Sequence, residues 1–391
     1  MITKLEIKGY RAFEEFEMDH LRKINLIVGM NNRGKTSVLE ALELVSSRSK
    51  TVILNSLQRR GEMVKEEGES GVRYFADISK LFHGFNASLG SRIQIIETSR
   101  DQIHSLQPLS KAETKSTNFI SEILELNTDP ASQYRQKPIE DDFEYVINQL
   151  QLAVSWEMKS DEIQKTAIGY RYELSPDGGL IPQRFVKPSN EVRNALFVST
   201  EGFPAERLVS FLERIALTDD EKLIIQSLQI IEPKIDRYAT ETTPQQTRGF
   251  LFNQERIPQK RGVKLKLTGS DEPVPIGTLG DGVWRLLGLI AGLLNTKNGV
   301  FLIDEIDTGL HYTVMKKMWE IVSTIAQKFD IQVFATTHSQ DCIDSLASVI
   351  ESGKFPKESF SIQRINQTST RTVSYSEEEI VSASDHGIEM R

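Results

Sequence analysis

The sequence predicts an α/β fold with a mixed central sheet, an antiparallel β subdomain and a helical insert. A short apolar strand at residues 24–28 leads through a glycine-rich loop into a helix with apolar positions at helical spacing. Two more apolar strands, at 300–303 and 331–335, flank a helical segment, which is the order expected in a parallel sheet. Between these ends, residues 46–199 are polar and contain short strand-like runs, which indicates an inserted subdomain.

The N-terminal residues predict two short strands. Apolar and polar side chains alternate through residues 2–18, and we expect the turn between the strands at Gly9. Farther along, residues 92–96 and 170–174 are the clearest strand-like runs of the polar region.

Two helices are predicted after the polar region. The first covers residues 205–216. The second is opened by Thr218, with Glu221 three residues on, and this spacing is typical of a capping box that satisfies two amide donors at a helix start.

The C-terminal part returns to a regular pattern. A strand at 263–267 precedes a helix at 283–294, and the helix between the two parallel strands carries an apolar stripe that we expect in the core. Two closing strands, 360–365 and 372–375, are followed by a helix that begins with a capping box. Its two residues are Ser376 and Glu379.

These patterns divide the chain into three parts. We expect the core domain in residues 1–45 and 262–391, and a mixed α/β insert in 46–199. Residues 200–261 should form a helical subdomain and a basic hairpin.

Composition excludes several classes of protein. The net charge of -8 argues against a general nucleic-acid coat, because phosphate affinity comes largely from Lys and Arg. The single cysteine, Cys342, excludes an internal disulfide framework and fits a reducing compartment. No apolar run is long enough for a spanning helix and no signal peptide is visible, so we expect a cytoplasmic protein.

The glycine-rich loop fits the pattern G-x-x-x-x-G-K-[ST] over residues 29–36, between a strand and a helix. Backbone amides and the helix N-terminus should hold the phosphates of ATP. Lys35 should reach the β and γ phosphates, and the hydroxyl of Thr36 should bind Mg²⁺, which prefers oxygen ligands. The predicted nucleotide-binding residues of this phosphate loop are Gly29, Asn31, Asn32, Arg33, Gly34, Lys35, Thr36 and Ser37.

Two acids follow the strand at 300–303. Asp304 is predicted to hold the magnesium shell, and Glu305 to orient the attacking water as the general base. The neighbouring strand leads to His338, which should lie at the same carboxyl edge and contact the γ-phosphate.

Several segments together resemble ABC-type ATPases of the SMC, RecF and OLD kind, and most closely the stand-alone OLD-like AAA ATPases of prokaryotes. They are residues 7–13, the phosphate loop, 278–282, 304–311 and 336–339. The resemblance implies an ABC-type ATPase head that dimerises head to head on ATP. It also implies that Asp307 lies in the loop crossing the dimer interface, and that Arg11 approaches the nucleotide.

Residues 278–282 are similar to the ABC signature, which caps the γ-phosphate of the opposite protomer. The resemblance assigns this role to Thr278, Gly280, Asp281 and Gly282. Thr278 keeps the hydroxyl of the family's usual serine, and the remainder departs from the usual form. The active site would thus be completed by a second copy of the chain.

The segments between and after the motifs distinguish the members of this class of ATPases. The segment between Thr36 and Thr278 lacks the sustained heptads of a chromosome tether. The chain after His338 is shorter than an ordinary domain, so we expect no nuclease of its own.

Two functions remain open. The protein is an antiphage sensor or scaffold that acts on a separately encoded effector such as a nuclease, or a RecF-like repair ATPase that clamps duplex DNA. A third reading, an ATP-gated module without hydrolysis, would leave Glu305 idle. We favour the first, with turnover that is slow without a trigger. Support for DNA contact comes from one basic stretch, Arg256, Lys260, Arg261, Lys264 and Lys266.

Overall fold

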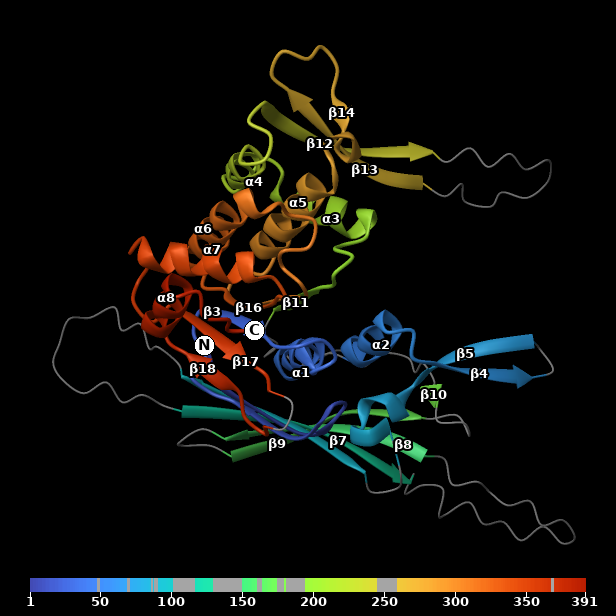
Figure 1. The fold of residues 1–391 in the computed structure, drawn as a ribbon. Coiled ribbons are helices and arrows are strands. Elements are labelled where there is room, and N and C mark those ends of the chain that lie inside the picture. The colour runs from blue at the N-terminus through green and yellow to red at the C-terminus, as the bar shows by residue number, and fades with distance from the viewer. Residues whose placement is uncertain are drawn as a thin grey trace, which may run out of the picture. The chain divides into compact units, whose positions relative to one another are not determined.

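The structure is a computed structural model, and it describes residues 1–47, 50–68, 71–85, 87, 91–100, 117–128, 150–159, 164–173, 179–180, 194–244, 259–366 and 369–391. The chain forms two compact units. Unit 1 comprises Met1–Arg22, Gly29–Arg193 and Gln363–Ser374, and unit 2 comprises Lys23–Val28, Asn194–Ile362 and Tyr375–Arg391. Figure 1 labels their elements.

Unit 1 is built on a six-stranded antiparallel sheet of order β2-β1-β6-β7-β8-β9. Ile2, Leu5, Ile7 and Tyr10 of β1 are buried, and the residues between them are partly or fully exposed, as expected for a strand with one face in a core. The strands are β1 (Ile2–Tyr10), β2 (Phe13–Met18), β6 (Arg92–Arg100), β7 (Thr117–Thr128), β8 (Leu150–Lys159) and β9 (Gln164–Glu173).

Two helices and a smaller sheet complete unit 1. The smaller sheet has the order β10-β5-β4, and α1 is buried along most of its length. The elements are α1 (Lys35–Ser47), α2 (Lys50–Arg59), β4 (Met63–Gly68), β5 (Gly71–Asp77), β10 (Gly179–Leu180) and two 3-10 turns, η1 (Ile78–Leu81) and η2 (His83–Phe85).

The central sheet has the order β11-β15-β16-β3-β17-β18, and its first four strands, all of unit 2, are parallel. Every residue of β3, β15 and β16 is buried, which explains their continuous apolar sequences. The strands are β3 (Ile24–Val28), β11 (Ala195–Val198), β15 (Val300–Ile303), β16 (Gln332–Thr336), β17 (Phe360–Arg364) and β18 (Val373–Tyr375). The predicted parallel half is therefore confirmed, and β11, which lies within the predicted insert, forms its edge.

Helices pack against this sheet around a hydrophobic core of buried residues. In Figure 1, α5, α6 and α7 lie together on one side of the parallel strands. The buried side chains of α6 include Met318, Val322 and Ile325, as its apolar stripe predicts. The helices are α5 (Asp281–Leu294), α6 (Tyr312–Lys328), α7 (Gln340–Glu351) and α8 (Glu377–Asp385).

The remaining part of unit 2 contains two helices and a three-stranded sheet of order β12-β13-β14. Helix α3 (Ala205–Ile215) buries its apolar face, and α4 (Glu221–Leu228) follows it. The strands are β12 (Ile235–Pro244), β13 (Gln259–Leu267) and β14 (Val274–Pro275), and the 3-10 turn η4 (Ile276–Leu279) leads into α5.

The fold class predicted from the sequence, α/β with a mixed central sheet, an antiparallel β subdomain and helical elements, is confirmed. The capping box at the start of α8 is also confirmed, since Ser376 and Glu379 exchange both hydrogen bonds.

Two local predictions are wrong. The first turn lies at Arg11 and Ala12 rather than at Gly9, because β1 continues to Tyr10. The capping box at Thr218 does not form: α4 begins at Glu221, whose carboxylate accepts a hydrogen bond from the Leu217 amide instead.

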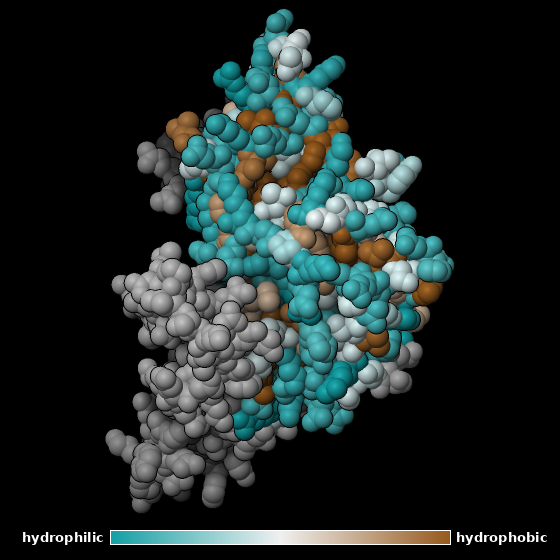
Figure 2. Space-filling view, turned by 90° about the vertical axis from the view of Figure 1, so that its left-hand side faces the viewer, coloured by the Kyte–Doolittle hydropathy of each residue, from teal (hydrophilic) through white to brown (hydrophobic). Residues whose placement is uncertain are grey.

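Figure 2 shows one face of the molecule, and hydrophilic residues dominate its coloured surface, with hydrophobic residues in scattered areas. Within the described part of the chain, no helix has the length and apolar character needed to cross a membrane.

Candidate functional site

The carboxyl ends of three parallel strands carry the predicted site residues. In register, Ile303 lies beside Ala335, and Ala335 lies beside Leu26. The chain leaves β15 at Asp304 and β16 at Thr337, and β3 ends at Val28, directly before the phosphate loop. This is the edge of a parallel sheet at which ligands bind.

Thr336 joins the two sheet-edge acids. Its Oγ1 donates a hydrogen bond of 2.7 Å to Oδ1 of Asp304 and accepts one of 2.8 Å from the amide of Glu305. Thr336 is fully buried, whereas the acids are partly exposed. One hydroxyl of β16 therefore orients both the carboxylate of Asp304 and the backbone of Glu305.

Glu305 has an unusual backbone. Its φ of 48° lies in the left-handed region, which residues other than glycine rarely adopt. Its side chain is 42% exposed. One carboxylate oxygen accepts a hydrogen bond of 3.3 Å from Thr308, and the other lies 3.9 Å from Nε2 of His338. The structure thus brings the predicted base close to His338, the residue predicted to contact the γ-phosphate.

Asp307 is tied to the strand that precedes His338. Oγ1 of Thr337 donates a hydrogen bond of 2.6 Å to the Asp307 carboxylate, and the same oxygen accepts one from the Ser339 amide. Ser339 in turn caps α7. The loop that carries Asp307 is therefore fixed to the end of β16 within one protomer.

The signature segment, residues 278–282, forms the turn at the start of α5. Thr278 is exposed, and its hydroxyl bonds to the Pro275 carbonyl. Gly280 has a φ of 90° and precedes α5 without a side-chain cap. A Cβ on Gly282 would lie 2.9 Å from the carbonyl oxygen of Gly309, so only glycine allows this close approach.

Arg285 is a site residue that the sequence analysis missed. Its guanidinium is buried and donates to the carbonyl oxygens of Ser199 at 2.7 Å, Asp304 at 3.0 Å and Glu305 at 3.1 Å. Burial lowers the pKa of Arg285, against the opposing effect of the Asp304, Asp307 and Glu305 charges. An arginine remains a cation at neutral pH, so α5 delivers a positive charge to the sheet-edge acids.

The phosphate loop lies in unit 1, between β3 and α1. The ammonium of Lys35 donates to the carbonyl oxygens of Gly29 at 2.8 Å and Met30 at 3.0 Å. Gly29 has a φ of 145°, and a Cβ there would lie 2.7 Å from the carbonyl oxygen of Ile365. A glycine is therefore required at the first position of the loop.

Gly34 and Asn32 shape the rest of the phosphate loop. Both have positive φ, and a Cβ on Gly34 would lie 2.5 Å from the ring of Phe13. Asn31 is exposed, whereas Arg33 and Thr36 are partly buried. The Val38 amide bonds to the Gly34 carbonyl, which starts α1 directly after the loop.

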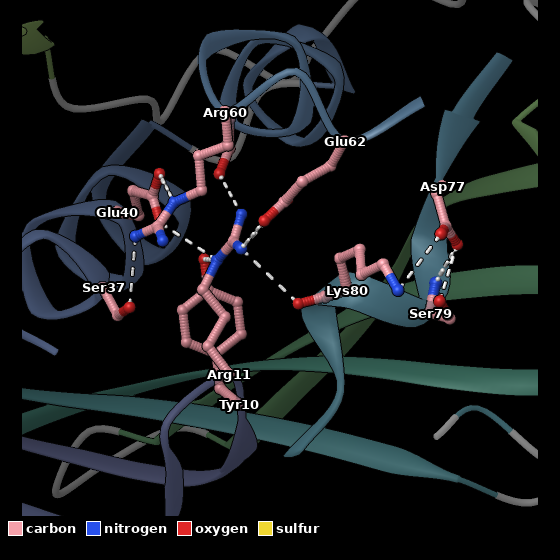
Figure 3. Close-up of polar contacts among 10 residues, drawn as sticks. Tyr10, Arg11, Ser37, Glu40, Arg60, Glu62, Asp77, Ser79 and Lys80 are labelled. Carbon is pink, nitrogen blue, oxygen red and sulfur yellow. Dashed lines mark hydrogen bonds and ion pairs between the residues drawn. The ribbon is translucent and has the colours of Figure 1, made fainter. Parts of the chain in front are cut away.

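A buried network of charged side chains contacts α1 (Figure 3). Glu40 on α1 is 1% exposed and accepts hydrogen bonds from Nε and one terminal nitrogen of Arg60, at 3.0 and 2.9 Å. Arg60 also donates to the hydroxyl of Ser37, next to Thr36. This contact connects the network to the first turn of α1.

Arg11 is the other cation of this network. Its Nε lies 3.0 Å from Glu40, and its terminal nitrogens donate to Glu62 and to Ser56. The resemblance assigned Arg11 to the nucleotide, and that role stays a prediction. The contacts in unit 1 give it a structural role in anchoring α1.

Tyr10 shares the buried network with Arg11. Burial raises the pKa of Tyr10 to about 12, and the charge of Glu40 adds to the shift. Burial opposes the charged form of Arg11, but Tyr10, Glu40 and Glu62 raise the pKa of Arg11 above its ordinary value. Tyr10 therefore stays neutral and Arg11 stays charged across the neutral range.

The described side chains of the basic stretch form ion pairs or hydrogen bonds with other groups of the same chain. Arg261 lies 3.5 Å from Glu213, Lys264 pairs with Glu241, and Lys266 donates to the carbonyl of Asp271 at 2.8 Å. Arg256 lies outside the described residues, and only the backbone of Lys260 is described.

The chain is similar to several known proteins. A curated protein from Helicobacter pylori, named ATP/GTP phosphatase, is 24% identical over 371 residues, covering 91% of this chain and 90% of its own length. A RecF protein of Thioalkalivibrio sulfidiphilus is 40% identical over 47 residues, or 12% of this chain and 13% of that protein. The crystal structure of an SMC head bound to the ScpA winged-helix domain covers 96% of this chain and 97% of its own, with 15% identity and a TM-score of 0.46.

A match to a protein family covers most of the chain. Residues 1–343 match the AAA ATPase domain family, including the phosphate loop, the signature segment, the sheet-edge acids and His338. The chain belongs to the AAA ATPase domain family.

Proposed function

We propose that the protein binds ATP with Mg²⁺ at the phosphate loop and hydrolyses it with Glu305 as the general base. The observation that carries this proposal is the connection between Asp304 and Glu305 through Thr336. The buried hydroxyl of Thr336 orients Asp304 through its carboxylate and Glu305 through its amide. Two acids held by one hydroxyl, at the sheet edge where β3 leads into a phosphate loop, suit metal binding and water activation.

The donor set fits Mg²⁺ chemically. Mg²⁺ is usually held by one or two carboxylates together with substrate phosphates and waters. Asp304 supplies a carboxylate and Thr36 a hydroxyl, and the described residues contain no cluster of three or more His, Cys, Asp or Glu that could hold a metal alone. The bound ion would neutralise charge on the phosphates. Lys35 would give up its bonds to the loop carbonyls and contact the β and γ phosphates.

We propose that the nucleotide closes two copies of the chain head to head. Gly280 leaves the first turn of α5 without a side-chain cap, which suits a phosphate of the opposite protomer. Asp281 and Gly282 begin that turn, Asp307 would lie at the interface, and His338 would contact the γ-phosphate.

The biological role proposed is that of an ATP-driven sensor or scaffold for a separately encoded effector, such as a nuclease, in antiphage defence. A RecF-like clamp on duplex DNA is the second candidate. The described members of the basic stretch, Arg261, Lys264 and Lys266, are each engaged with groups of the same chain, and this favours a protein partner over DNA phosphates.

The first experiment compares the wild type with Glu305→Gln. The variant keeps the size of the side chain and removes the base, so ATP turnover should fall about 10²- to 10⁴-fold. It should still bind ATP and accumulate as a closed dimer with Mg²⁺ in light scattering. Glu358→Gln, at an exposed position away from the sheet edge, is the control and should behave as the wild type. Equal turnover in Glu305→Gln and wild type would disprove the assignment of the base.

The second experiment identifies the partner. Tagged Glu305→Gln protein is purified from its native host with Mg²⁺ and ATP, and the co-eluting material is analysed by mass spectrometry and nuclease digestion. A stoichiometric protein that elutes only with ATP supports the effector role. Nuclease-sensitive duplex DNA without a protein partner would overturn it and support the repair ATPase.

A further inference from the structure

The strongest unassigned feature of unit 2 is the buried cation of α5. The helix is apolar along its packed length, with Val283, Leu286 and Leu287 buried around Arg285. Arg285 itself is 7% exposed. An apolar residue would fill the same volume without burying a charge, so the position calls for an explanation beyond packing.

Arg285 donates its hydrogen bonds to backbone carbonyl oxygens rather than to side chains. One terminal nitrogen reaches the carbonyl of Ser199 at the end of β11, and the other reaches the carbonyls of Asp304 and Glu305 at the end of β15. Its Nε is buried and has no hydrogen-bond partner among the described residues. The guanidinium thus ties α5 to the ends of two strands of the parallel sheet.

A second contact joins the same two elements. The first turn of α5 approaches so closely that a Cβ on Gly282 would meet the carbonyl of Gly309 at 2.9 Å. Gly309 lies near the end of the acid loop, which we define as residues 304–310. The start of α5 therefore touches the acid loop at its far end, and Arg285 touches it at its beginning.

The backbone of Glu305 is hydrogen-bonded on both sides, at its amide and at its carbonyl. The hydroxyl of Thr336 accepts from its amide, and Arg285 donates to its carbonyl. Glu305 has a positive φ, a conformation that persists only when its surroundings hold it. A small movement of α5 would shift the backbone of Glu305 through Arg285, and would change the orientation of the Glu305 carboxylate.

We propose that Arg285 is a positioning residue that couples the signature end of α5 to Glu305 of the same protomer. This inference rests on the proposed function. In the proposed dimer, the signature segment of one protomer contacts the nucleotide held by the other. Its own Glu305 serves the nucleotide at its own phosphate loop. Arg285 therefore links the occupancy of one ATP site to hydrolysis at the other, and ATP hydrolysis becomes cooperative.

The test compares Arg285→Gln and Arg285→Lys with wild type in the full-length protein. We measure kcat, the ATP concentration at half-maximal rate, the Hill coefficient, ATP affinity by equilibrium binding and Tm. Arg285→Gln should lower kcat roughly tenfold and reduce the Hill coefficient from near 2 to near 1. Its ATP affinity should change less than about threefold, because Arg285 bonds to the acid loop, whereas the predicted nucleotide contacts lie elsewhere.

Arg285→Lys keeps a cation that can reach one carbonyl, and should restore part of both kcat and cooperativity. Arg207→Gln is the matched control, since Arg207 on α3 packs over the rings of Phe203 and Phe211 and lies outside the acid loop. It should leave the Hill coefficient unchanged. If Arg285→Gln does not fold, Gly282→Ala disturbs the second contact while Arg285 stays in place, and should lower cooperativity in the same direction.

The outcomes separate this inference from the proposed function. A wild type that neither dimerises with ATP nor hydrolyses it would contradict the proposed function. A wild type that dimerises and hydrolyses ATP cooperatively, with unchanged cooperativity in Arg285→Gln, would overturn the inference alone. A fall in Tm without any change in kcat or in the Hill coefficient would also overturn it, because it would reveal a purely structural arginine.

Discussion

The hydroxyl of Thr336 donates a hydrogen bond of 2.7 Å to the carboxylate of Asp304, and the same oxygen accepts the amide proton of Glu305. This arrangement connects β16 to the acid that would hold the metal and to the acid that would activate water. This geometry makes the buried Thr336, to which the sequence analysis assigned no role within segment 336–339, a candidate determinant of catalysis.

Thr336→Val tests this arrangement. The substitution keeps the shape and leaves the amide of Glu305 without an acceptor, so the free energy of unfolding should fall by about 1–3 kcal/mol. ATP turnover should fall more than ATP affinity, because the acids move while the phosphate loop is intact. Thr336→Ser keeps the hydroxyl and should retain most of the turnover. Equal turnover in Thr336→Val and wild type would contradict the positioning role. Urea denaturation and steady-state kinetics provide the two measurements.

Arg11→Met tests the buried network behind α1. The change removes one of the two cations that surround the Glu40 carboxylate, which is 1% exposed, and breaking a buried pair typically costs about 3–5 kcal/mol. Lys354→Met breaks a surface pair with Glu320 and should cost at most about 1 kcal/mol. Chemical denaturation of both variants gives the comparison, and equal losses of stability would contradict the anchoring role of Arg11.

Tyr10→Phe tests the pH dependence of stability. Burial raises the pKa of Tyr10 to about 12, so the folded protein keeps this phenol neutral at pH values where the unfolded chain loses its proton. The contribution is therefore complete below a pH of about 10 and is lost as the pH rises towards about 12.

The measurement is the free energy of unfolding of wild type and Tyr10→Phe between pH 9 and about 11.5. The wild type should lose stability more steeply over this range than the variant. Parallel curves would show that the Tyr10 phenol does not titrate differently in the folded and unfolded states.

The sequence predicts those parts of the site that depend on local pattern. The strand, loop and helix around Lys35, the apolar strand that ends at Asp304 and the capping box at Ser376 each lie within a few consecutive residues, and each was predicted correctly. The parallel order of β15 and β16 also followed from their apolar sequences and the helix between them.

The sequence does not reveal contacts that join distant segments through the backbone. Arg285 bonds to carbonyl oxygens, which every residue carries, so no side-chain pattern marks its partners. The sequence also does not reveal the network of Arg11, Glu40 and Arg60, because these side chains come from three separate segments. The capping box expected at Thr218 failed because Glu221 bonds to the Leu217 amide instead.

The most direct test of the central claim asks whether two copies share each ATP site. We combine Lys35→Ala, which should lose nucleotide binding, with Gly280→Asp, which places a charge and a Cβ at a position of positive φ. Each variant alone should be inactive. Gly277→Ala, where a Cβ meets nothing within 4 Å, serves as the control and should be active.

In a mixture of the two variants, each mixed dimer contains one intact site, formed by the phosphate loop of one protomer and the signature segment of the other. Random pairing should restore up to about a quarter of the wild-type hydrolysis rate. Different tags on the two variants report that mixed dimers form. A mixture that forms mixed dimers and still hydrolyses ATP no faster than the separate variants, at every ratio, would contradict a site completed by a second copy.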